Sequence, residues 1–163
     1  MLVSIDIRRL ALLDRWEVVD SWGRWPSSDL LLRGDPPTGT APDLTSVPTG
    51  IRSLLADDAA VVLGWQSLAG PLALPARWRP DAGGLATSGQ AMLLAAAASG
   101  SPAAVCAERS RYRLKTKQGL LMAGDGHARL DGLGPGARVT LDVRRTTWWA
   151  GEDRQTIEAT TGP

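Results

Sequence analysis

The densest group of side chains able to do chemistry lies at residues 109–118, which read Arg-Ser-Arg-Tyr-Arg-Leu-Lys-Thr-Lys-Gln. This segment carries five cations in ten residues and no acid. Clustered cations bind phosphate through charge-assisted hydrogen bonds, and Tyr112 offers an aromatic face on which a planar ring can stack. We therefore take Tyr112, Lys115, Lys117 and Gln118 as candidate contacts for a phosphate-bearing ring compound. The alternative is a solvated basic loop between two strands.

Other chemistries find little support in the sequence. His127 is the one histidine, and no cysteine or carboxylate lies at a spacing suited to a shared metal ion. We interpret it as a hydrogen-bonded or surface residue, with axial ligation of haem as the alternative. The single cysteine, Cys106, excludes a disulfide within the chain. A Gly-x-Ser-x-Gly motif is absent, so hydrolysis has no visible nucleophile.

Two short patterns resemble sites but are better explained structurally. Gly124-Asp125-Gly126 lacks the Lys-Ser/Thr pair of a phosphate-binding loop, so we expect a bulge or a tight barrel corner. Strand alternation places Asp142 and Arg144 on one face, where we expect them to pair weakly in solvent.

Elements of strand length dominate the second part of the chain. Thr49 is expected to cap a short helix that leads into them, and an apolar helix is expected at 92–98. The seven tryptophans, with no phenylalanine present, are expected mainly to pack the core. Six strands are predicted, at 59–65, 72–78, 85–88, 103–108, 119–130 and 137–149.

The two ends of the chain repeat one another. Residues 3–9, Val-Ser-Ile-Asp-Ile-Arg-Arg, match residues 139–145, Val-Thr-Leu-Asp-Val-Arg-Arg, at four identical positions. Chance similarity of two strands is one explanation, and a duplicated domain is the other. We predict an N-terminal strand segment at 1–25 that repeats the last barrel strand, a Pro/Gly-rich linker at 26–47 and a barrel domain at 48–163.

Charge and hydropathy set limits on partners and location. The formal net charge of +1 provides no field that would attract nucleic acid or an anionic membrane. Charged residues interrupt the first nine positions, and no apolar run approaches the length of a membrane-spanning helix. We expect a cytoplasmic protein that binds neither nucleic acid nor membrane.

The order of these elements, together with Leu74-Pro75-Ala76-Arg77-Trp78, the segment 117–128 and the pair Trp148-Trp149, resembles a known family. It is similar to the FMN-binding split barrel of pyridoxamine 5′-phosphate oxidase-like proteins, over residues 48–158. The repeated strand fits a tandem-duplicated member that lacks most of its first repeat. The resemblance implies a mainly β fold: a six-stranded antiparallel split barrel of Greek-key type with a few short helices, plus an extra N-terminal strand.

The resemblance also implies a function, that of a flavin-dependent or deazaflavin-dependent oxidoreductase-like protein acting on a small-molecule substrate. Its cofactor would be FMN, with the deazaflavin coenzyme F420 or haem as alternatives. The flavoprotein would be a homodimer with the cofactor in the groove between subunits, and no side chain need act as acid or base. The residues that match the family's phosphate-binding strand ends are Arg77, Trp78, Thr87, Ser88 and Gln90.

A lysine that the family often carries after the Thr/Ser pair is missing, because the chain continues Gly89-Gln90-Ala91-Met92. This departure favours a second hypothesis, a cofactor-less split barrel that serves as a binding or assembly module. A haem-binding split barrel, with His127 as axial ligand, is the third.

Overall fold

The computed structural model describes residues 9–14, 17–24, 34, 36–40, 42–67, 70–79, 84–89, 92, 100–111, 116–130 and 136–159. One short helix, α1 (Thr49–Arg52), continues into the 3-10 turn η1 (Ser53–Leu55). The strands are β1 (Arg9–Asp14), β2 (Glu17–Gly23), β3 (Ala60–Ser67), β4 (Gly70–Arg79), β5 (Gly84–Ser88), β6 (Ser101–Arg111), β7 (Thr116–Leu130), β8 (Gly136–Ala150) and β9 (Asp153–Glu158).

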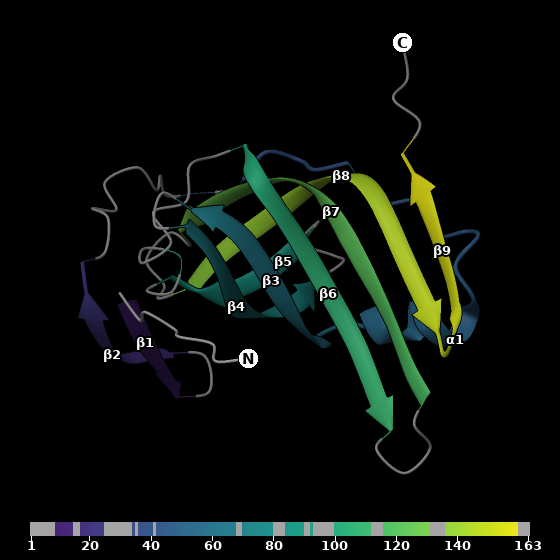
Figure 1. Ribbon diagram of the computed structural model, residues 1–163. Coiled ribbons are helices and arrows are strands. Elements are labelled where there is room, and N and C mark those ends of the chain that lie inside the picture. The colour runs from purple at the N-terminus through teal and green to yellow at the C-terminus, as the bar shows by residue number, and fades with distance from the viewer. Residues whose placement is uncertain are drawn as a thin grey trace.

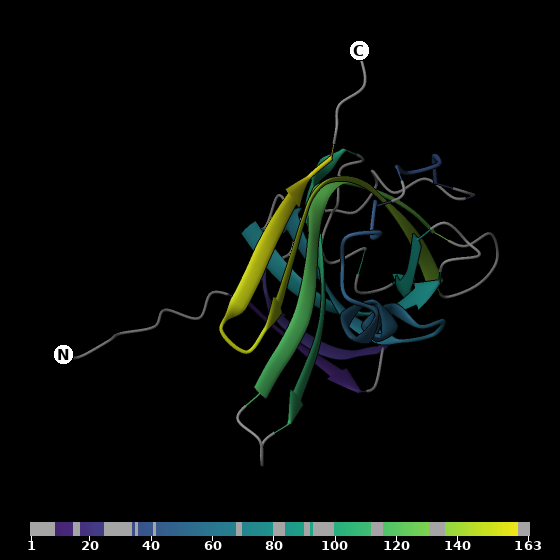
Figure 2. The same cartoon turned by 90° about the vertical axis from the view of Figure 1, so that its right-hand side faces the viewer.

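Six of these strands close into an antiparallel barrel (Figures 1 and 2). The sheet runs β5-β4-β3-β6-β7-β8-β9, and a further pairing of β5 with β8 completes the ring. Within it β6, β3, β4 and β5 lie in the order of a Greek key, since β6 returns beside β3 after the hairpins β3–β4 and β4–β5. The predicted six-stranded antiparallel barrel is confirmed.

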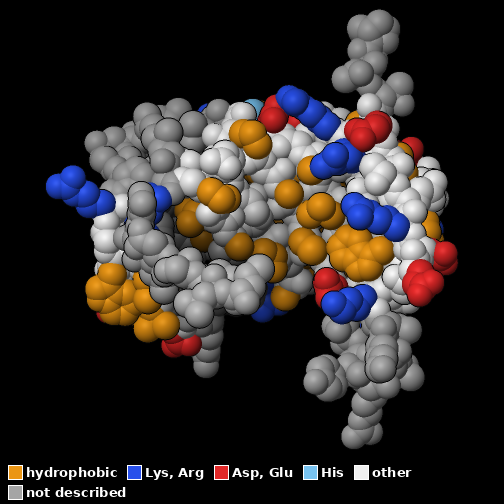
Figure 3. All heavy atoms as spheres, viewed as in Figure 1, with side chains coloured by type: hydrophobic (Ala, Val, Ile, Leu, Met, Phe, Trp, Pro, Cys, Tyr) orange, Lys and Arg blue, Asp and Glu red, His pale blue; other side chains and the backbone are white. Residues whose placement is uncertain are grey.

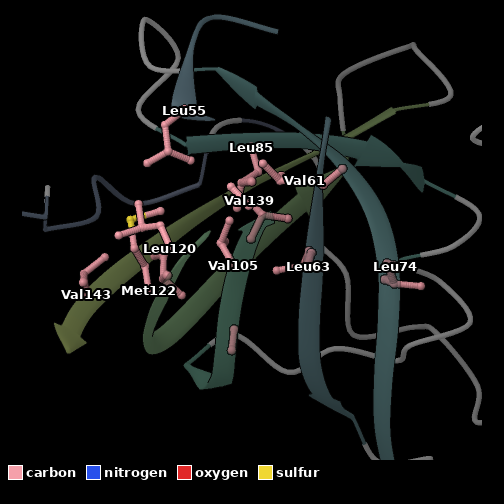
Figure 4. Packing of buried hydrophobic residues seen from close by; sticks show 14 of the residues in the cluster. Leu55, Val61, Leu63, Leu74, Leu85, Val105, Leu120, Met122, Val139 and Val143 are labelled. Atoms are coloured by element: carbon pink, nitrogen blue, oxygen red, sulfur yellow. The ribbon is translucent and has the colours of Figure 1, made fainter. Parts of the chain in front are cut away.

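Alternation of side chains produces the barrel core. In β3 the residues Val61, Leu63 and Trp65 are buried, whereas Val62 between them is exposed. Figure 4 shows the buried side chains of several strands meeting inside the barrel. Inward residues of the other strands include Leu74, Ala76, Leu85, Val105, Leu120, Met122, Ala137, Val139, Leu141 and Val143.

A bulge interrupts the long β7–β8 ladder at the predicted place. The register shifts between Ala123 and Gly124. A Cβ atom at Gly124 would overlap the carbonyl oxygen of Asp142 on β8, so the two backbones approach closely only because position 124 is glycine. The glycine pattern at 124–126 therefore serves the bend of the barrel.

Several details of the predicted elements are wrong. β9 was not predicted, and because it follows β8, Trp148 and Trp149 do not close the last strand. Thr49 does not cap α1; its hydroxyl instead accepts a hydrogen bond from Arg52 Nη2 at 3.0 Å. The helix predicted at 92–98 lies outside the described residues except for Met92, which is fully buried.

The N-terminal segment contains a hairpin of two strands, β1 and β2, in a sheet of their own. Most of the repeated segment 3–9 lies outside the described residues. The hairpin nevertheless has a counterpart: Asp14 pairs with Glu17 at its turn, and Ala150 pairs with Asp153 between β8 and β9. Both pairs differ by 136 positions (150 − 14 and 153 − 17), the offset of the sequence repeat.

The close approach at Gly124 can be tested by substitution. Gly124→Ala should lower the free energy of unfolding by about 1–3 kcal/mol, because the added methyl group forces β7 and β8 apart. Gly64→Ala is the matched control, since its Cβ would meet only Ala104 O at 3.7 Å, an ordinary contact. Urea unfolding measures both variants, and equal losses would contradict this account.

Candidate functional site

Three arginines stand in one row across the outer surface of the barrel. Arg77 on β4 lies opposite Ala86 on β5, and Ala86 lies opposite Arg138 on β8. Arg138 in turn faces Arg129 on β7. Opposed residues of antiparallel strands share a face, so all of these side chains point outward. We call Arg77, Arg129 and Arg138 the arginine row.

The arginine row concentrates positive charge on partly buried positions. All three residues are of intermediate exposure. Like charges directly opposite one another in a sheet destabilise it, which applies to Arg129 and Arg138. Because guanidinium groups form strong charge-assisted hydrogen bonds with phosphate and carboxylate, the arginine row is a candidate anion site. Ala86 between Arg77 and Arg138 is small, so it leaves room above the sheet for that anion.

The Asp58 carboxylate places a negative charge beside Arg77, at one end of the arginine row. Arg77 Nη1 donates to the Asp58 carbonyl oxygen at 3.0 Å, and its distance to Asp58 Oδ2 is 3.9 Å. Arg79 Nη2 lies 3.0 Å from Asp58 Oδ1. These groups are about half exposed, so the pairs contribute little stability but orient the Arg77 guanidinium.

A flat apolar surface borders the arginine row. Val62 on β3 lies opposite Pro75 on β4. Two positions along the same strands, Ala60 on β3 lies opposite Arg77 on β4. Val62 is 48% exposed. We call the outward side chains Ala60, Val62 and Pro75 the shelf. Figure 3 shows hydrophobic side chains gathered over the middle of the viewed face, where β3 and β6 lie in Figure 1.

A segment that precedes α1 lies against β8 and is held there by side chains. We call residues 36–40 and 42 the strap. The Thr140 hydroxyl donates to Pro37 O at 2.7 Å, and Asp142 Oδ1 accepts from Thr40 N at 2.9 Å and from Thr40 Oγ1 at 3.2 Å. The strap thus docks on the stretch of β8 between the residues paired with β5 and those paired with β9.

Asp142 is the centre of this anchorage. Its pKa is lowered, chiefly by the hydrogen bond from the Thr40 backbone N–H, with further contributions from His127 and the Thr40 hydroxyl that outweigh partial burial. His127 Nε2 lies 3.0 Å from Asp142 Oδ2, as expected of a hydrogen-bonded histidine. The expected pairing of Asp142 with Arg144 is wrong, because Arg144 pairs with Asp125.

The described residues give no support for a metal site or a haem site around His127 and Asp142. Among them, no group of three histidine, cysteine or carboxylate side chains could hold a metal ion. No described helix is long and apolar enough to cross a membrane. The hydrogen bond between His127 and Asp142 would have to break before His127 could ligate haem through Nε2.

The predicted site residues fall into two separate groups. Arg77, Trp78, Thr87 and Ser88 come together on β4 and β5, where the Thr87 hydroxyl donates to Pro75 O at 2.6 Å. Arg77 and Ser88 face outward, whereas Trp78 and Thr87 face inward. Thr87 is buried, so within one chain its hydroxyl serves the β4–β5 junction.

The other predicted residues lie elsewhere. Lys117 and Gln118 begin β7, where Gln118 pairs with Ala150 at the far end of β8 from β5. Within one chain they do not join the β4–β5 group. Three further residues of the prediction, Gln90, Tyr112 and Lys115, lie outside the described residues.

Sequence reasoning missed Arg129 and Arg138. Both follow from alternation in predicted strands, which places them outward beside the buried Ala128 and Val139. Their position opposite each other and in line with Arg77 needed the strand register, and the sequence offered no signal for that.

Comparisons of the chain with protein-family models, with curated proteins and with solved structures find no match. The family resemblance therefore stays a prediction, and function must be argued from the geometry.

The anchorage of the strap should depend on pH. The pKa of Asp142 is lower in the folded chain than its ordinary value of 3.8, so the carboxylate contributes stability above that value and loses it as the pH falls through the folded pKa. Asp142→Asn should therefore lower stability at pH 7, and the difference from the unsubstituted chain should shrink towards pH 2.5. Urea unfolding across this range measures it.

Glu152→Gln provides the control for this prediction, since it removes an exposed carboxylate in the turn between β8 and β9. A deficit of Asp142→Asn that stays constant with pH would contradict the role given to the ionised carboxylate.

Proposed function

We propose that the outer face of the barrel binds a phosphate-bearing planar ring compound, with FMN as the ligand, and that the chain is a flavin-dependent oxidoreductase-like protein. The observation that carries the proposal is the arginine row beside the apolar shelf. A deazaflavin has the same combination of flat ring and phosphate and belongs to the same proposal.

The phosphate would be held by the arginine row. Neighbouring strands are about 4.8 Å apart, so Arg77 and Arg138 stand roughly 10 Å apart across β5, a gap that two long side chains can bridge around one phosphate. Ser88, two positions from Ala86 on the same face, adds a hydroxyl donor.

The ring would lie on the shelf. Val62 and Pro75 are two strand positions, about 7 Å, from Ala60 and Arg77, which separates the ring from the phosphate by part of a ribityl chain. Small apolar side chains let a flat ring approach the sheet closely. The flavin would supply the hydride chemistry, and the chain would position it.

A second copy of the chain would complete the site. One barrel covers only one face of a ring that lies on the shelf, and Val62 remains half exposed. We propose a homodimer in which the ring lies between two subunits and a small-molecule substrate reaches its free edge.

The proposal is tested by comparing FMN with riboflavin, which lacks the phosphate. Unsubstituted protein should bind FMN more tightly than riboflavin, as measured by quenching of flavin fluorescence. Arg138→Gln removes one charge-assisted contact, worth about 1.5–3 kcal/mol, and should weaken FMN binding roughly 10-fold to 100-fold. Binding of riboflavin should not change.

Arg154→Gln is the matched control, because Arg154 is an exposed arginine on β9, outside the arginine row. Unfolding curves of both variants establish that they are folded. Equal affinity for FMN and riboflavin, or equal weakening by both substitutions, would refute the proposal and favour the cofactor-less binding module.

A further inference from the structure

We infer that the barrel has a second binding site, an apolar pocket under the strap that takes a small, uncharged, two-ring aromatic molecule. This site is independent of the flavin proposal. It lies on the other side of the sheet and has the opposite chemistry.

The pocket is where β5 and β8 diverge. Its volume is about 290 Å³. The strap forms one wall, and the remaining walls come from inward side chains of the barrel. The lining residues are Thr38, Gly39, Thr40, Pro42, Trp78, Gly84, Leu85, Met122, Leu141 and Val143.

The walls of the pocket are fixed in place. A Cβ at Gly39 would lie 2.7 Å from Leu141 O, so the strap touches the β8 backbone there. Gly84 approaches the Val139 carbonyl oxygen in the same way. With Thr40 hydrogen-bonded to Asp142 as well, the strap is attached to β8 at several points. The pocket is thus part of the folded barrel.

The volume of the pocket and its lining residues together define the kind of ligand that fits it. An apolar cavity of about 150 Å³ stays dry and binds benzene, and this pocket has nearly twice that volume. The polar side-chain atoms of the lining are the hydroxyls of Thr38 and Thr40 and the indole nitrogen of Trp78, so a buried water finds few of the two to four polar partners that it needs. The lining given above contains no charged residue, so a charged guest would lose its hydration without compensation. Trp78 offers an aromatic surface on which rings can stack.

Strand alternation separates the two sites. Trp78 and Leu85 are opposite each other and line the pocket, whereas Arg77 and Ala86, each one position away, are opposite each other on the outer face. A ligand on the arginine row therefore makes no contact with the pocket, and each site can be changed without the other.

The experiment uses 1-naphthol as the probe and 1-naphthoate as its charged analogue. Unsubstituted protein should bind one 1-naphthol per chain, seen by naphthol fluorescence and by a rise in melting temperature, and should bind 1-naphthoate at least roughly tenfold more weakly. Val143→Phe, which fills the pocket, should abolish binding of 1-naphthol. Val62→Phe makes the same change on the shelf and should leave it intact.

Equal binding of the two probes, no binding at all, or full binding by a folded Val143→Phe variant would overturn the inference. Leu141→Phe is a second filling variant if Val143→Phe does not fold. If neither filling variant folds, the inference is tested by comparing the binding of 1-naphthol with that of 1-naphthoate, on the unsubstituted chain and on Val62→Phe. Arg138→Gln should leave naphthol binding unchanged, so failure of the flavin proposal and failure of this inference give different results.

Discussion

The short pairing of β5 with β8 is the constraint on which the rest of the barrel depends. Four opposed residue pairs, from Leu85 with Val139 to Ser88 with Gly136, join the first strand of the sheet to the part of β8 that does not pair with β9. This closure pairs the otherwise free edge of β5 and encloses the apolar core. It also aligns Arg77, Arg138 and Arg129 in one row, because the row crosses the β5–β8 junction. Both candidate sites are therefore consequences of the same closure.

β8 contributes residues to both candidate sites of the molecule. Along its length it pairs first with β5, then contacts the strap, and finally pairs with β9, while β7 runs along its other edge. The strap lies along the stretch of β8 between its pairings with β5 and with β9. Without the strap, the backbone groups of that stretch would have no neighbouring segment. Asp142 and Thr140 bind it from the outward face, whereas Leu141 and Val143 line the pocket from the inward face. Alternation within one strand thus builds two unrelated surfaces.

The hairpin β1–β2 can be compared with the β8–β9 hairpin at the offset of the sequence repeat. It has the same turn register as the end of β8 with β9, at the same offset of 136 positions. The environments differ: Thr146 on β8 is buried, but Leu10, its counterpart on β1, is 49% exposed. The two hairpins therefore share the register of their turns, up to the register shift between Leu12 and Leu13. Among the described residues β1 and β2 pair only with each other, whereas β8 also pairs with β7.

The sequence by itself determined the six barrel strands but not the hairpin β1–β2 or β9, because strand alternation and glycine patterns are local properties of the chain. It predicted the six barrel strands, the short helix and the bulge near Gly124. It missed β9, whose mostly exposed strand lacks an apolar pattern. Only the tertiary structure decided which residues meet, since strand register depends on packing between segments far apart in sequence. The alignment of Arg77 with Arg138 across β5 and the hydrogen bonds between the strap and Asp142 are of this kind. For the same physical reason, residues 109–118 hold the densest group of candidate side chains in the sequence, yet the described part of that segment lies away from the arginine row.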